Sequence, residues 1–230
     1  MKKMYNRFHN FWTEEKSLTA LLIILAVHIF FIQPVADKNI LAGKIIVYSF
    51  YFLLLVSGIQ FLNSSRRQWI ITTILIAGVC MLFYSELYET NVAIQLLADF
   101  FMIWYFALLA WVVLKRIFYK GPISVHRIQG SIVLYLLIGF LFSNIFHVLY
   151  LLYADAAFKG LGIGSKDEFL YFSFTTLTTV GYGDITPAMD YSRSMANMEA
   201  LIGQLYPAIL IARLVSMEVE SKKRYPDKTE

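Results

Sequence analysis

Hydrophobic residues in this chain are gathered in long, nearly unbroken runs that short polar stretches separate. A helix needs about 20 mostly apolar residues to cross the roughly 30 Å of hydrocarbon in a bilayer. Six runs reach or approach that length, the third being the shortest: residues 18–35, 45–62, 69–84, 92–114, 131–153 and 195–215. The pattern predicts an all-α membrane protein with six transmembrane helices.

A seventh apolar stretch, residues 169–180, lies between the last two predicted spans. It is too short to cross a membrane and is rich in threonine. Ser165 followed by Glu168 is a capping-box pattern, so a helix is expected to start there and to end near Thr178. We interpret this helix as a re-entrant segment between two membrane spans.

Composition and charge agree with a membrane protein. The chain is 58% apolar and only 16% charged, whereas soluble domains are about half apolar and a quarter charged. Of the 20 Lys and Arg residues, 14 fall on one side of the predicted spans and five on the other, with Arg213 near the inner end of the last span. Because basic residues favour the cytoplasmic side, both termini are expected in the cytoplasm of a cell-membrane protein. This topology accounts for the net charge of +4, so no nucleic acid partner is expected.

The sequence Thr179-Val180-Gly181-Tyr182-Gly183-Asp184 follows the predicted re-entrant helix. It resembles the signature of the potassium channel family, in which backbone carbonyls replace the hydration shell of the ion. Consecutive carbonyls can face one axis only if alternate residues take left-handed backbone angles. Glycine adopts these angles freely, whereas other residues pay about 1–2 kcal/mol. The glycines at 181 and 183 fit this requirement.

The resemblance implies an extended selectivity filter and a set of site residues. The carbonyls of Thr179, Val180, Gly181 and Tyr182, with the Thr179 hydroxyl, would bind potassium as the permeant ion, and no other cofactor or metal is implied. The side chains of Val180 and Tyr182 would point away from the axis and pack against the pore helix. Residues in the positions that support the filter are Gly183, Asp184, Thr178, Tyr171, Phe172 and Thr175. One chain supplies a quarter of a ring, so three identical subunits are expected as partners in a homotetramer within the lipid bilayer.

Two features depart from the family's pattern. Relatives commonly carry two tryptophans where Tyr171 and Phe172 stand, and Phe172 cannot donate a hydrogen bond. Some bacterial relatives pair the filter aspartate with a glutamate where Thr175 stands. Both departures concern the rigidity of the filter.

The last predicted span contains candidate cavity and gate residues. Gly203 falls where related pores carry a hinge glycine, and Pro207 removes one backbone hydrogen bond to the Gly203 carbonyl. The resemblance implies that Gln204 faces the water-filled cavity. It also implies that Glu199 faces the pore helix, where Thr175 or Thr176 would donate a hydrogen bond to it. In the alternative reading, Gly203 only permits close packing and Pro207 makes a static kink.

The fourth predicted span, residues 92–114, contains no Arg or Lys. Steep voltage gating needs several mobile charges, so the first four helices are expected to form a scaffold without a voltage sensor. The only charge in this span, Asp99, is expected near the outer interface, where water satisfies it. The alternatives are ligand binding, titration or pairing with a basic group. His147 is expected to be a hydrogen-bonded packing residue.

The expected organisation follows from these segments. It consists of a cytoplasmic N-terminal segment, a four-helix scaffold, a cytoplasmic linker with a short helix at 123–129, a pore domain and a cytoplasmic tail: residues 1–17, 18–114, 115–129, 130–216 and 217–230. No nucleophile–base pair or metal constellation points to an enzyme. The expected function is a potassium-selective channel subunit without steep voltage gating. The alternatives are a weakly selective cation channel, a membrane subunit of a potassium uptake system, or a non-conducting regulatory subunit.

Overall fold

The computed structural model describes residues 14–32, 91–117, 125–162 and 164–224, together with residues 43, 45, 46, 49 and 78. The predicted spans at 45–62 and 69–84 lie outside the described residues, apart from these isolated positions. Most of the predicted linker and both chain ends also lie outside the described residues.

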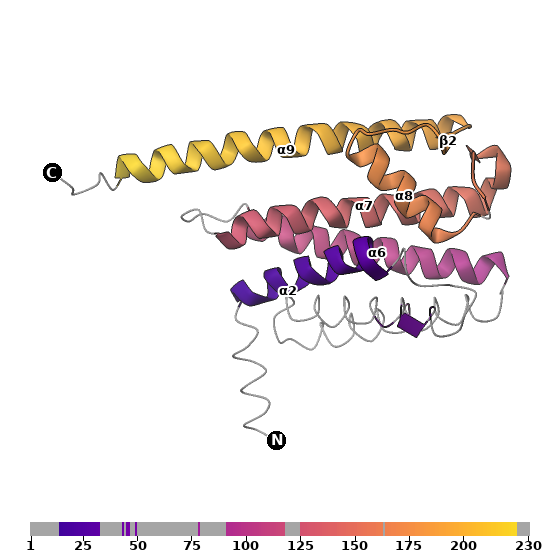
Figure 1. The fold of residues 1–230 in the computed structure, drawn as a ribbon, viewed down its shortest axis with the longest axis horizontal. Helices are drawn as coiled ribbons and strands as arrows, with labels where there is room; N and C mark the ends of the chain where they lie inside the picture. Colours follow the sequence, from indigo (N-terminus) through magenta and orange to yellow (C-terminus); the bar gives the residue numbers. More distant parts are fainter. Residues whose placement is uncertain are drawn as a thin grey trace, which may run out of the picture.

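The described part is almost entirely helical (Figure 1). Helix α2 (Glu14–Val27) continues into the π-helix η1 (His28–Ile32). The other helices are α6 (Val92–Ile117), α7 (Val125–Tyr153), the 3₁₀ turn η2 (Ala154–Ala156), α8 (Lys166–Leu177) and α9 (Asp190–Arg224). Two short strands, β1 (Phe158–Lys159) and β2 (Thr186–Pro187), pair antiparallel.

Three of the described helices are long and apolar enough to cross a membrane: Val92–Lys115, Arg127–Ala156 and Asp190–Arg213. They coincide with the fourth, fifth and sixth predicted spans. The first predicted span corresponds to the shorter apolar helix Leu18–Ile32. The predicted separate helix at 123–129 is wrong from Val125 onward, because these residues form the first turns of α7.

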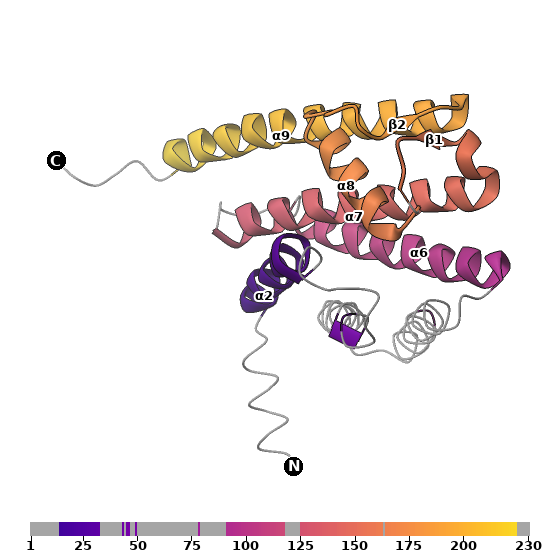
Figure 2. The same cartoon turned by 45° about the vertical axis from the view of Figure 1, so that its right-hand side comes forward.

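The long helices lie side by side, and the short helix α8 lies between α7 and α9 (Figures 1 and 2). Helices α2, α6 and α7 share one hydrophobic core, in which Leu21, Phe106 and Phe140 are fully or almost fully buried. Helix α6 therefore packs along α7 of its own chain. This contact brings the last scaffold helix next to the C-terminal half of the chain.

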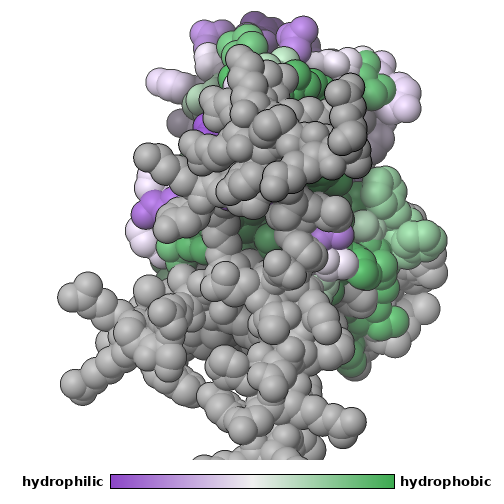
Figure 3. All heavy atoms as spheres, turned by 90° about the vertical axis from the view of Figure 1, so that its left-hand side faces the viewer, coloured by the Kyte–Doolittle hydropathy of each residue, from purple (hydrophilic) through white to green (hydrophobic). Residues whose placement is uncertain are grey.

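The outer flank of α6 is apolar as well. Phe100, Trp104 and Trp111 expose more than half of their surface. Figure 3 views the molecule from the end that lies at the left of Figure 1. Hydrophobic residues reach the surface along the right-hand side of that view. Such surfaces are unfavourable in water and suit a lipid bilayer or the contact with another chain.

Candidate functional site: the end of α8 and the segment after it

Helix α8 has the bounds that the sequence predicts, with Ser165 as its N-cap and Thr178 as its C-cap. The expected capping box is wrong in detail, because the Ser165 side chain makes no capping hydrogen bond. Glu168 instead accepts a hydrogen bond at 2.8 Å from the amide of Gly162. Asp167 and Glu168 lie in the first turn, where negative charge is favourable.

Beyond α8 the chain turns and lies against the helix it has just left. The Thr175 carbonyl accepts the amides of Val180 at 2.9 Å and Gly181 at 3.1 Å, and the Thr176 carbonyl accepts the amide of Thr179 at 3.0 Å. Within the described ranges, no hydrogen bond ends on the carbonyls of residues 179–182. The amides of residues 179–181 are thus bound on the helix side, and the carbonyls of residues 179–182 remain available to a ligand. We call residues 179–184 the candidate filter segment.

The backbone of the candidate filter segment alternates in the way that the sequence predicts. Thr179, Gly181 and Gly183 have φ angles of 60°, 54° and 80°. The two glycines therefore lie in the left-handed region, as expected from their positions. Thr179 was not expected there, since a residue with a side chain pays about 1–2 kcal/mol for this conformation. A strained residue at the start of such a segment is typical of functional sites.

Tyr182 packs on α8 and keeps an exposed surface, and Val180 is exposed as well. The Tyr182 ring stacks on the Tyr171 ring with 6.3 Å between centroids and 1° between planes. Its packing against the predicted pore helix is therefore seen in the structure, although Tyr182 remains 72% exposed and Val180 52% exposed. In a single chain these two side chains have open surface that another chain can cover.

Asp184 and Tyr171 form a hydrogen bond of 2.7 Å between the Tyr171 hydroxyl and the carboxylate. This bond lowers the pKa of Asp184 below its ordinary 3.8 and raises the pKa of Tyr171 to about 12. Tyr171 therefore supplies a hydrogen-bond donor to the candidate filter segment. The ionised Asp184 is the state that the bond stabilises.

The Tyr171→Phe variant is expected to shift the acid dependence of any ion current through the site. In the wild type, the hydrogen bond from Tyr171 to the ionised Asp184 is fully formed above pH 3.8. It is lost as the pH falls through the lowered pKa of the carboxyl group. Without the hydroxyl, Asp184 takes up its proton at a higher pH. Currents recorded at external pH values between about 3 and 5.5, spanning the ordinary range of Asp, should then fall at a higher pH in the variant. Superimposable curves for the two proteins would show that the bond does not act on the site.

Phe172, the second departure from the family's pattern, lies in an aromatic cluster behind the candidate filter segment. Its ring meets Phe146 at 4.9 Å and Phe158 at 5.4 Å between centroids, both edge to face. Edge-to-face pairs contribute about 0.5–1.5 kcal/mol beyond their buried area. Dispersion and ring geometry thus hold this wall, since Phe172 has no side-chain hydrogen-bond donor.

The strands reinforce the C-terminal end of the segment. β1 and β2 pair Phe158 with Pro187 and Lys159 with Thr186. Gly160, with φ of 83°, lies so close to the Asp184 carbonyl that a Cβ atom there would overlap it. The loop before α8 therefore packs directly on the segment.

The hydroxyls of Thr175 and Thr178 bond within α8 and its cap. Thr175 Oγ1 donates to the Phe172 carbonyl at 2.9 Å, and Thr178 Oγ1 donates to the Phe174 carbonyl at 2.6 Å. The sequence led us to expect a hydrogen bond between Glu199 and Thr175 or Thr176. In the structure Glu199 contacts Ser173 instead, two residues before Thr175 on the helix.

Glu199 is fully buried against α8. Ser173 Oγ lies 2.5 Å from Glu199 Oε1 and 2.7 Å from the Gly139 carbonyl oxygen. A hydroxyl has one proton and the carbonyl can only accept, so both contacts are hydrogen bonds together only if the Glu199 carboxyl carries a proton. No hydrogen-bond partner is found for Oε2 within the described part of the chain. Glu199, Ser173 and Gly139 thereby join α9, α8 and α7 in one contact.

A neutral side chain at position 199 is therefore expected to preserve this contact. Glu199→Gln keeps the shape and a donor for Ser173, and the assembled protein should melt close to the wild type. Glu199→Ala leaves a cavity and removes a buried hydrogen bond, which together destabilise each chain by about 2–4 kcal/mol. Thermal melting of the two purified variants tests the pair. Equal losses in both would show that a charged carboxylate is needed.

The candidate gate residues lie along one continuous helix, because α9 runs through Pro207 without interruption. Gly203 packs against the end of α8, where an added Cβ would overlap the Leu177 carbonyl oxygen and lie 2.7 Å from its carbon. The same carbonyl accepts the Tyr135 hydroxyl at 2.9 Å. Gln204 is exposed in the single chain. The close-packing reading of Gly203 thus has direct support, and hinge motion stays a prediction.

Asp99 does not lie in water near the outer interface, and that expectation is wrong. Its side chain is completely buried. It pairs with the Lys166 ammonium at 2.7 Å and with His147 Nδ1 at 2.5 Å. Pairing with a basic group, one of the alternatives, is what the structure shows, and His147 is hydrogen-bonded as expected. The partners lie 67 and 48 residues away in the chain, so no local pattern could have found them.

Comparisons with known proteins bear on the same region. Residues 131–220, which span α7 to α9, match the family model described as "Ion channel". Two curated relatives are similar over shorter stretches. They are the protein LctB of Bacillus caldotenax, 45% identical over 49 residues, and the protein LctB of Geobacillus stearothermophilus, 41% identical over 56 residues.

These matches cover only part of this chain and of each relative. The LctB matches cover 21% and 24% of this chain, and 36% and 41% of the relatives' own length. No solved structure matches the chain significantly. The family match supports an ion channel, and with the apolar helices it indicates a membrane protein.

Proposed function

We propose that this chain is a subunit of a potassium-selective channel in the cell membrane, with residues 179–184 as its selectivity filter. The observation that carries the proposal is the backbone of that segment. The amides of residues 179–181 are bound to α8, the φ angles of the segment alternate into the left-handed region, and the carbonyls of residues 179–182 accept no hydrogen bond within the described ranges. Rings of such carbonyls coordinate dehydrated potassium in channel filters.

A single chain provides one carbonyl at each level of the filter, whereas a dehydrated ion needs several oxygen ligands. A ring of four identical subunits supplies them. The exposed apolar side chains of Val180 and Tyr182, and those of Leu201, Leu205 and Ile209 on α9, support this assembly. They would be covered by the neighbouring copies around the axis.

The proposed channel is not steeply gated by voltage. Moving one charge across 100 mV is worth about 2.3 kcal/mol, and α6 contains no basic residue between Val92 and Leu114. We propose that the chain crosses the membrane six times, with both termini in the cytoplasm.

Reconstitution tests the proposal. The purified protein should have the native mass of four chains, and liposomes that contain it should release potassium but not sodium along their gradients. Equal fluxes of both ions would favour a weakly selective cation channel. Flux that saturates and requires a second protein would favour an uptake subunit, and no flux would favour a regulatory subunit.

A further inference from the structure

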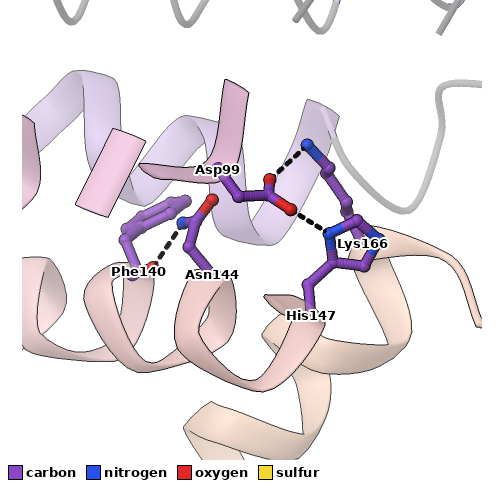
Figure 4. A network of polar contacts seen from close by, with 5 residues as sticks. All are labelled: Asp99, Phe140, Asn144, His147 and Lys166. Atoms are coloured by element: carbon purple, nitrogen blue, oxygen red, sulfur yellow. Dashed lines mark hydrogen bonds and ion pairs between the residues drawn. The ribbon is translucent and has the colours of Figure 1, made fainter. Parts of the chain in front are cut away.

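Three helices meet at the buried carboxylate of Asp99 (Figure 4). Asp99 belongs to α6, His147 to α7, and Lys166 is the first residue of α8. One carboxylate oxygen accepts from Lys166 at 2.7 Å and the other from His147 at 2.5 Å. Both oxygens of the buried acid are thus used, and each ties the scaffold helix to a different helix of the channel-like region.

Lys166 stands where its charge is locally unfavourable. The N-terminal end of a helix carries partial positive charge, which repels a cation in the first turn. The side chain of Lys166 is 20% exposed and reaches Asp99, whose side chain has no exposure. A buried carboxylate without its partner is strongly unfavourable. The contact with α6 therefore accounts for a lysine at position 166, whereas the helix that begins there does not favour one.

His147 holds the carboxylate in place. Its Nδ1 atom contacts Asp99, and its ring lies 5.5 Å from the Phe169 ring of α8. In Figure 4 the His147 ring and the Lys166 side chain approach Asp99 from the same end. The arrangement fixes the direction in which Asp99 presents its other oxygen to Lys166.

The opposite end of α8 bears the candidate filter segment. Helix α8 has only 12 residues, so about three turns separate its two ends. The Thr175 carbonyl near its C-terminal end binds the amides of Val180 and Gly181. A displacement of Lys166 by α6 is therefore transmitted along the helix to the backbone that would bind the ion.

We propose that the Asp99–Lys166 ion pair is the contact through which the scaffold sets the position of the pore helix and, with it, the open probability of the filter. Asp99 and Lys166 are positioning residues, and His147 orients Asp99. The inference rests on the proposed channel function. It places the influence of the scaffold at the outer end of the pore helix, separate from the linker that joins α6 to α7.

Single-channel recording of the full-length protein tests this proposal. Lys166→Gln and Asp99→Asn are each expected to lower the open probability roughly tenfold, within the usual range of coupling between sites. The open probability of the double variant should be no lower than that of either single variant, because the two substitutions remove the same contact. Lys166→Arg, which preserves the ion pair, should gate like the wild type. The matched control is Asp190→Asn, since Asp190 is 99% exposed and lies 3.9 Å from Arg193 in a surface pair.

The outcomes separate this inference from the function on which it rests. A role in stability alone would lower the melting temperature of the tetramer and leave open probability unchanged in the channels that assemble. That result, or additive losses in the double variant, would overturn the inference while the channel still conducts. Asp99→Asn remains informative even if Lys166→Gln fails to fold, because it removes the buried charge together with the ion pair and leaves only the partly exposed Lys166 without a partner. A wild-type protein that passes no ions would overturn the proposed function itself and this inference with it.

Discussion

Replacing Gly181 by alanine is expected to abolish selective potassium conduction. Gly181 has a φ angle of 54°, and an added Cβ would meet nothing within 4 Å in the same chain. The obstacle is therefore the left-handed backbone, which raises the free energy by about 1–2 kcal/mol in each copy and would raise it by about 4–8 kcal/mol in the proposed ring of four. The segment relieves this strain by rotating its peptide planes. The carbonyls that would bind the ion then turn away.

The matched control is Gly162→Ala, in the loop that precedes α8. Gly162 has no left-handed φ angle, and a Cβ there would lie 3.3 Å from a flexible carboxylate oxygen of Glu168. This variant should conduct like the wild type. The relative permeability to potassium and sodium, measured for both variants, gives the comparison. Intact selectivity in Gly181→Ala would contradict the role assigned to the alternating backbone.

Gly203→Ala is expected to destabilise the assembly and to disturb the filter together. The added methyl group would overlap the Leu177 carbonyl, which lies two residues before Thr179. Overpacking of this kind costs about 1–3 kcal/mol in each chain, and neither backbone can move without changing the end of α8. The melting temperature of the variant should fall, and its selectivity or conductance should change as well.

Pro207→Ala separates the packing role from hinge motion. It restores a backbone donor to α9 without adding volume beside α8, so it leaves the Gly203 contact unchanged. If α9 bends at this point during gating, Pro207→Ala should lower open probability while permeability ratios stay at the wild-type values. A Gly203→Ala channel with altered gating alone and normal stability would favour the hinge and contradict the packing role.

The local features of the site could be predicted from the sequence because each has a local cause. The ends of α8 follow from Ser165, the acidic first turn and the change of pattern near Thr178. The left-handed positions of Gly181 and Gly183 follow from the absence of a side chain. Even so, Thr179 shares their conformation, and nothing in its side chain predicts it. It becomes evident only when the amides are seen bound to α8.

The polar contacts between helices could not be predicted, since they depend on which faces meet. Asp99 finds Lys166 because α6 packs on α7 beside the start of α8. Glu199 meets Ser173 in place of Thr175 or Thr176, because one turn of α8 presents several hydroxyls and only packing selects among them. Buried polar groups form hydrogen bonds with one another across the bundle. The spacing of residues within one helix does not show which partner on another helix each group will contact.

Planar-bilayer recording of the purified wild-type protein tests the central claim most directly. With potassium at unequal concentrations on the two sides, and sodium added to make the ionic strength equal, the current should reverse close to the potassium equilibrium potential. Open probability should change little between about −100 and +100 mV, since several charges moving at about 2.3 kcal/mol each per 100 mV are needed for steep gating. A reversal potential near zero would show that the carbonyl segment does not select potassium and would contradict the account.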